Sequence, residues 1–258
     1  MMAVKGVNGV EINYADVGEG DVVVLLHGLG STNQDWDLQI PVLSQKFRVI
    51  APDFRAHGKS TKIPEDQSVE LMTADIYELL KLLGISSADF VGFSMGGAVC
   101  FQMALSHPEI TEKLVIINSG PDFNRPNDAG VDILALRTEI IRREGFTSLA
   151  ETISVGMFPG ENQEKWREEF KQRLVQNNEE AYLKTFGELM KWGIGDEVAK
   201  IKNETLVIAS DQDYTPVSYK EDFVRKMPDA KLTIIENSRH GVVLDQADKL
   251  NEVLLKFL

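Results

Sequence analysis

Short runs of apolar and often β-branched residues recur along the chain, and each run ends in a polar or turn residue. They lie at residues 11–18, 22–26, 47–53, 88–94, 113–119, 205–210 and 231–236. The run from Val22 to Leu26 is apolar throughout, which is typical of a strand buried on both faces. These runs predict the strands of a mostly parallel sheet.

Segments with apolar residues at helical spacing lie between the predicted strands. Residues 68–84 are the clearest case, with Ser68 as the predicted N-cap and Gly84 as the predicted stop. The last segment repeats this spacing with Leu250, Leu254 and Phe257. Strands that alternate with helices predict βαβ units and therefore an α/β fold.

The alternation stops between about residues 121 and 200, where no convincing strand is present. Four helices are predicted in this stretch, over Asp132–Glu144, Ser148–Met157, Gln163–Gln176 and Glu179–Trp192. We interpret residues 121–200 as a helical insertion and residues 1–120 with 201–258 as the sheet-forming core. Most of the large apolar side chains of the insertion are expected to pack its own core, and a few to face a cleft. These side chains are Phe146, Met157, Phe158, Trp166, Phe170, Phe186, Met190 and Trp192.

Composition narrows the classes of function. The chain has 258 residues and a net charge of −13, which disfavours binding to nucleic acids or to anionic membrane surfaces. Cys100 is the single cysteine, so neither an internal disulfide nor a thiolate-rich metal site is expected. The N-terminus lacks the apolar run of a signal peptide, and no apolar stretch reaches about 18 residues. We therefore expect a cytoplasmic protein, whose oligomeric state the sequence leaves open.

The motif Gly92-Phe93-Ser94-Met95-Gly96 lies where a predicted strand gives way to a predicted helix. This G-x-S-x-G pattern is typical of a sharp strand-to-helix turn that exposes a nucleophilic serine. Side chains two residues before and after the serine would collide across such a turn, and glycine avoids the collision. We predict Ser94 as the nucleophile and the Met95 amide, at the helix N-terminus, as an oxyanion donor.

A serine nucleophile needs a base, and four histidines are available. His27 and His57 lie in loops well before Ser94, and His107 lies at a predicted helix end. His240 follows the late strand 231–236. Because loops at the carboxyl ends of parallel strands share one edge of the sheet, His240 is the predicted base.

A carboxylate must orient the imidazole and stabilise its charged form. The strand at 205–210 leads into two aspartates, Asp211 and Asp213. Asp213 is favoured because Thr215-Pro216 is typical of a helix start, which places Asp213 at the loop apex. Asp211 and Asp122, which follows an earlier strand, remain alternatives.

A second oxyanion donor is expected from the glycine-rich turn after Leu26, and the Leu29 amide is the candidate. A strand followed by Gly28-Leu29-Gly30, with Asp53 further on, also matches part of the glycine-rich motif of dinucleotide-binding proteins. The sixth position of that motif is Asn33 rather than glycine, so no nucleotide site is predicted.

With these residues in place, the chain resembles the α/β-hydrolase superfamily over nearly its whole length. The segments VVLLHGLG, APDFRAHGKS, VGFSMGGAV, LVIASDQDYTP and SRHGVVLDQ stand in the order of that family. The resemblance implies a doubly wound sheet with a helical cap inserted after the sixth strand, and it is nearest to small serine esterases and lactonases of the enol-lactonase and carboxylesterase group. Ala56, Ser210 and residues 245–247 depart from the usual family residues, outside the predicted triad.

The predicted activity is hydrolysis of a small-molecule carboxylic ester or lactone through an acyl-enzyme, without metal or cofactor. Hydrolysis of a carbon–carbon bond and cofactor-free perhydrolysis are alternatives on the same triad. A third alternative is a signalling protein that binds a small molecule and turns it over slowly. Histidines titrate near pH 6.5 when unperturbed, so the rate is expected to fall in mild acid.

Overall fold

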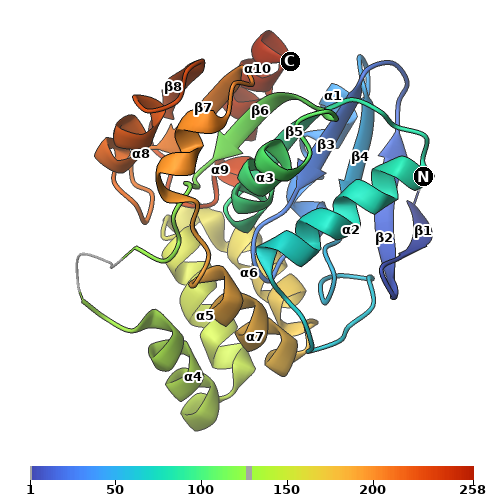
Figure 1. Cartoon of the computed structure of the whole chain (residues 1–258). Coiled ribbons are helices and arrows are strands. Elements are labelled where there is room, and N and C mark those ends of the chain that lie inside the picture. Colours follow the sequence, from blue (N-terminus) through green and yellow to red (C-terminus); the bar gives the residue numbers. More distant parts are fainter. Residues whose placement is uncertain (1, 126–129) are drawn as a thin grey trace.

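A single eight-stranded sheet forms the centre of the computed structural model, which describes residues 2–125 and 130–258 (Figure 1). The strands are β1 Met2–Val7, β2 Val10–Val17, β3 Val22–Leu26, β4 Arg48–Pro52, β5 Ala88–Phe93, β6 Thr111–Ile117, β7 Thr205–Ser210 and β8 Ala230–Ile235. Residues 1 and 126–129, which belong to the predicted ranges 1–120 and 121–200, lie outside the described residues.

The strand order is β1-β2-β4-β3-β5-β6-β7-β8. Strands β3 to β8 pair in parallel, and β2 is antiparallel to both β1 and β4. The sequence pattern did not predict β1. This edge strand pairs on one side only, and most of its residues are at least partly exposed, so it shows no continuous apolar run.

Helices surround the sheet and connect its strands. The α-helices are α1 Ile40–Leu43, α2 Val69–Leu82, α3 Met95–Ser106, α4 Ile133–Glu144, α5 Phe146–Met157, α6 Glu164–Val175, α7 Glu179–Leu189, α8 Val217–Val224, α9 Val242–Asp245 and α10 Ala247–Phe257. The described residues also form the short 3₁₀ helices η1 Asn33–Trp36, η2 Glu161–Gln163 and η3 Gly195–Lys200. Helix α2 confirms its predicted ends, since Ser68 Oγ accepts a hydrogen bond from the Leu71 amide and Gly84 follows with a φ of +70°.

Both faces of the sheet are covered, which confirms the doubly wound prediction. Residues of α2, α3 and α8 form one apolar cluster with alternate strand residues such as Val24 and Leu26. Residues of α1, α9 and α10 form a second cluster with Val23 and Leu25 on the opposite face. The β3 run is apolar throughout because its side chains enter two cores in turn.

The helices α4 to α7 interrupt the alternation of strands and helices. They follow β6 and precede β7, as the resemblance implied, and they lie together beside the sheet in the lower part of Figure 1. Their bounds agree with the predicted segments to within about three residues. We call residues 121–200, apart from 126–129, the cap.

Candidate active site

Ser94 lies at the apex of the turn between β5 and α3, in a backbone conformation that L-residues rarely adopt. Its φ is +52° and its ψ is −115°. The turn is held from β6, since the Ser94 amide donates to the Ile117 carbonyl at 2.9 Å. Ser119 Oγ donates to the Ser94 carbonyl at 2.7 Å. Hydrogen bonds on both sides of the residue therefore stabilise the strained conformation.

The two glycines of the motif allow close backbone approaches. A Cβ on Gly92 would lie 2.3 Å from the Gly96 carbonyl oxygen, which confirms the predicted collision across the turn. A Cβ on Gly96 would instead lie 2.1 Å from the Leu26 carbonyl oxygen, at the end of β3. The second glycine thus brings α3 against a neighbouring strand, which the motif by itself did not indicate.

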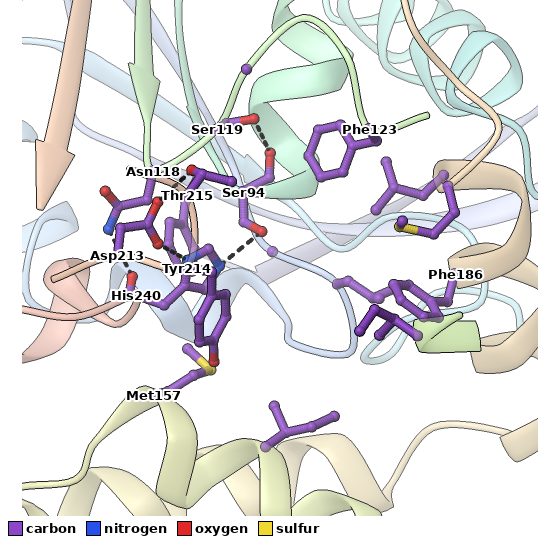
Figure 2. Close-up of a pocket in the computed structure, with 18 of the residues that line it drawn as sticks. Ser94, Asn118, Ser119, Phe123, Met157, Phe186, Asp213, Tyr214, Thr215 and His240 are labelled. Carbon is purple, nitrogen blue, oxygen red and sulfur yellow. Dashed lines mark hydrogen bonds and ion pairs between the residues drawn. The ribbon is translucent and has the colours of Figure 1, made fainter. Parts of the chain in front are cut away.

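The structure brings together Ser94, His240 and Asp213, although they are far apart in the sequence. His240 Nε2 lies 3.0 Å from Ser94 Oγ, and His240 Nδ1 lies 2.6 Å from Asp213 Oδ1. Figure 2 shows the three side chains in line, with the imidazole between the hydroxyl and the carboxylate. This is the arrangement in which an imidazole can accept a proton from a serine hydroxyl while a carboxylate orients it.

Asp213 is buried and is contacted on both carboxylate oxygens. Oδ2, which does not face His240, accepts from Lys220 Nζ at 2.6 Å and from Thr215 Oγ1 at 3.0 Å. Burial alone would raise the pKa of Asp213, but the attraction of His240 and Lys220 outweighs it and holds the pKa well below its usual range. The carboxylate therefore stays ionised throughout the neutral pH range.

Two aromatic rings hold the His240 imidazole. Tyr214 stacks on it, with ring centroids 4.3 Å apart and an interplanar angle of 21°. Phe93 contacts it in a tilted geometry at 5.1 Å. Because one residue comes from β5 and the other from the loop after β7, the imidazole plane is set by two separate elements.

Asn118, at the end of β6, ties the histidine loop to the sheet. Its Nδ2 donates to the His240 carbonyl at 3.0 Å and to Ser210 Oγ at 2.8 Å. Its Oδ1 accepts from the Ser210 amide at 2.8 Å. The residue adopts a positive φ of +45°, which asparagine tolerates better than most residues. The position of His240 thus depends on a polar bridge between β6 and β7.

The alternative acids have contacts of their own away from the imidazole. Asp211 Oδ1 accepts from the Ser238 amide at 3.2 Å and so braces the loop before His240. Asp122 Oδ1 accepts from the Gly195 amide at 2.7 Å within the cap connection. Neither contacts His240, so the geometry favours Asp213.

The remaining histidines serve other parts of the fold. His27 is fully buried, with Nε2 accepting from the Phe54 amide at 3.0 Å. The His57 ring lies 5.2 Å from the His27 ring, in the same buried region. His107 stacks on Tyr77 at the end of α3, with ring centroids 3.7 Å apart.

The two predicted oxyanion donors flank the serine. Met95 is the first residue of α3, and Leu29 lies in the turn after β3, where a Cβ on Gly28 would lie 3.6 Å from Ser94 Cβ. Neither the Leu29 nor the Met95 amide donates to another group within residues 2–125 and 130–258. Asp35 fixes the turn by accepting from the Gly28 amide at 3.2 Å.

A cavity of about 490 Å³ opens above Ser94 and His240, between the sheet edge and the cap. Four of the eight large apolar cap residues named from the sequence line it, namely Met157, Phe170, Phe186 and Met190. The other four pack elsewhere: Trp192, for example, joins the core under α3 and donates to Gln102. Five of the eight also belong to or pack against one apolar cluster that holds other cap residues, namely Phe146, Met157, Phe158, Trp166 and Phe170.

Four polar residues around the triad were missed by sequence reasoning. Asn118 and Ser119 are the polar end of the predicted run 113–119 and directly follow β6, and that position could have singled them out. Tyr214 adjoins the predicted acid, but its stacking requires the fold. Lys220 lies in a helix with no chemical pattern around it, so no sequence signal pointed to it.

The described residues bear on two further expectations. No helix within 2–125 and 130–258 is long and apolar enough to cross a membrane. No group of three or more His, Cys, Asp or Glu side chains in those ranges has an arrangement that could hold a metal ion.

The chain is similar to known proteins over nearly its whole length. The family described as alpha/beta hydrolase fold matches residues 21–247. The 2-hydroxy-6-oxo-6-phenylhexa-2,4-dienoate hydrolase of Burkholderia cepacia is 29% identical over 273 residues, covering 98% of this chain and 93% of that protein. The Stutzerimonas stutzeri (strain A1501) protein named "Putative carbamate hydrolase RutD" is 27% identical over 251 residues, covering 93% and 92%. An esterase structure from Exiguobacterium antarcticum matches with a TM-score of 0.90 at 25% identity, covering 98% of this chain and 97% of that chain.

Proposed function

The chain belongs to the alpha/beta hydrolase fold family, and from this premise we propose that it is a serine hydrolase that cleaves small carboxylic esters or lactones through an acyl-enzyme. One observation carries the proposal. The Ser94 hydroxyl, the His240 imidazole and the Asp213 carboxylate are joined at 3.0 and 2.6 Å at a cavity of about 490 Å³. A cavity of this size suits a small organic substrate.

The proposed reaction begins when Ser94 Oγ attacks the carbonyl carbon while its proton moves to His240 Nε2. Asp213 stabilises the imidazolium that forms. The Leu29 and Met95 amides, which have no partner among the described residues, would donate to the oxyanion. His240 then protonates the leaving alcohol, and water attacks the acyl-enzyme with His240 as base.

Hydrolysis of a carbon–carbon bond is a second candidate, because the Burkholderia cepacia relative is named for the hydrolysis of a dienoate. The same serine and histidine would serve in both reactions. The Stutzerimonas stutzeri relative is named "Putative carbamate hydrolase RutD", so a carbamate is a further candidate class of substrate. The cavity lining is largely apolar, which supports an apolar portion in whichever substrate is used.

The proposal is tested with p-nitrophenyl esters of increasing acyl length and with a fluorophosphonate probe. Ser94→Ala is expected to lower kcat by about 10⁶ and to abolish labelling, because the nucleophile is lost. Ser86→Ala is the matched control, since Ser86 is exposed and does not line the cavity. Ester hydrolysis by Ser94→Ala within tenfold of wild type would refute the assignment. A dienoate and an aryl carbamate assayed in parallel decide which bond is preferred.

A further inference from the structure

Helix α8 carries a lysine whose whole side chain is buried behind the triad. Lys220 is 0% exposed, and its Nζ lies 2.6 Å from Asp213 Oδ2. Nζ also donates to the Thr215 carbonyl at 2.7 Å and to Thr215 Oγ1. An ammonium group has three protons, and these contacts give each of them an acceptor. The lysine is therefore held by the loop that carries the triad acid.

Both carboxylate oxygens of Asp213 have hydrogen-bond partners. Thr215 Oγ1 accepts from Lys220 and donates to Asp213 Oδ2, so lysine and threonine occupy the same carboxylate oxygen. The other oxygen, Oδ1, is left to His240. In Figure 2, Thr215 and His240 approach Asp213 on different oxygens. Rotation of the carboxylate would break the bonds on both sides at once.

Stability alone gives a weak reason for a lysine at this position. Removing an ammonium from water costs several kcal/mol, and buried ion pairs are often replaced by apolar residues without loss of stability. Phe223 of the same helix joins the apolar core, whereas the Lys220 ammonium contacts polar atoms of Asp213 and Thr215. The position of the ammonium, on the far side of the triad acid, indicates a role in the chemistry.

We propose that Lys220 is a positioning residue that orients the Asp213 carboxylate toward His240 and offsets part of its negative charge, and so sets the acidic limit of activity. This inference rests on the proposed function. The Asp213 carboxylate stabilises the imidazolium, whereas the Lys220 ammonium, on the same carboxylate, opposes it. With the lysine present, the carboxylate therefore stabilises the imidazolium less than it would by itself, and the acidic limb of the activity profile is expected at lower pH.

Other charged groups face the Lys220 and Asp213 pair. Burial lowers the pKa of Lys220, the Asp213 carboxylate opposes this, and Arg125 adds to the lowering. Asp35 on η1 lies near His240. Burial raises the pKa of Asp35, and the neighbouring Arg173 and His240 oppose this.

Further groups face the stacked Tyr214 ring. The Tyr214 side chain is about half exposed, and its charged neighbours are Arg137 on α4, Asp213, and Arg239 just before His240. Tyr182 on α7 is the remaining titratable neighbour. All of these groups stay unchanged when Lys220 is replaced, so a comparison between variants isolates the ammonium.

The test measures kcat/KM for a p-nitrophenyl ester from pH 4.5 to 9 in wild type and in Lys220→Met, Lys220→Gln and Lys220→Arg. Loss of the charge in the Met and Gln variants is expected to move the acidic limb upward by about one to two pH units. The Arg variant keeps the charge and is expected to stay within about 0.5 unit of wild type. Lys226→Met is the matched control, since Lys226 is exposed and pairs with Asp196 away from the cavity.

The outcomes separate the two proposals. A lysine with only a structural role would lower the plateau of kcat/KM without moving the acidic limb of its pH profile. An acidic limb within about 0.3 pH unit of wild type in a folded Met or Gln variant therefore overturns the inference. Failure of both neutral variants to fold overturns it as well, because the ammonium would then be a requirement of folding. If wild type is not labelled at Ser94 by the fluorophosphonate, the proposed function falls and this inference falls with it. Labelling with an unmoved limb refutes the role of Lys220 alone.

Discussion

Two buried imidazoles near the start of the fold are expected to weaken it in acid. His27 is bonded in its neutral form, since Nε2 accepts from the Phe54 amide while Nδ1 lies 2.7 Å from the Gly28 carbonyl. His57 Nδ1 lies 2.9 Å from the Arg55 carbonyl. Burial lowers the pKa of His27 to about 4. Burial, and then the charge of His27, lower the pKa of His57 to about 3.

The sign and size of the effect follow from proton linkage. Each histidine titrates near 6.5 when unfolded, so below that pH the unfolded chain binds more protons than the folded one. The stabilisation is complete above pH 6.5 and is lost as the pH falls toward about 4 for His27 and about 3 for His57. At pH 5 the unfolded-state protonation of His57 is worth RT ln(1 + 10^1.5), or about 2 kcal/mol.

The perturbation is His57→Asn, which keeps a donor for the Arg55 carbonyl and removes the titrating ring. The free energy of unfolding is measured in urea at pH 7.5 and at pH 5.0 for the variant and for wild type. The variant is expected to be less stable at pH 7.5, because the ring leaves a cavity, but to lose about 2 kcal/mol less than wild type on acidification.

Ser60→Ala is the control for this measurement. It disturbs the same loop, since Ser60 Oγ donates to the Asp53 carbonyl, but it removes no titrating group. Its loss between pH 7.5 and 5.0 should equal that of wild type. If His57→Asn and wild type lose the same free energy to within about 0.5 kcal/mol, the argument from burial is wrong.

Two further predictions concern the turn and the loop that position the triad. Gly96→Ala places a Cβ 2.1 Å from the Leu26 carbonyl oxygen, so we expect the free energy of unfolding in urea to fall by at least about 2 kcal/mol and fluorophosphonate labelling to be lost. A variant labelled at the wild-type rate would contradict this. Asn118→Ala removes the hydrogen bond to the His240 carbonyl, so kcat for a p-nitrophenyl ester should fall about 10- to 100-fold while KM stays within about threefold of wild type. A change confined to KM would speak against a positioning role.

Much of the fold could be predicted because its signals are local. The apolar runs at 22–26 and 205–210 predict strands that are buried on both faces of a parallel sheet, and both runs form such strands. The cap helices were visible from their spacing, and Ser68 from its capping chemistry. Strand β1 was not visible, because an exposed edge strand needs no apolar run.

The sequence by itself determined the chemistry at the edge of the sheet. A serine between glycines at a strand end, a histidine after a later strand and an aspartate between them must approach one another, because the carboxyl ends of parallel strands share that edge. The meeting of Ser94, Asp213 and His240 at hydrogen-bonding distance agrees with this reasoning.

Only the tertiary structure decided what surrounds these groups. Asp211 and Asp213 are two residues apart, and the loop geometry alone turns one toward the imidazole and the other toward the Ser238 amide. Asn118 and Lys220 gain their roles from elements far away in the sequence. The direction of a side chain depends on the packing of neighbouring elements, and a linear pattern does not contain that information.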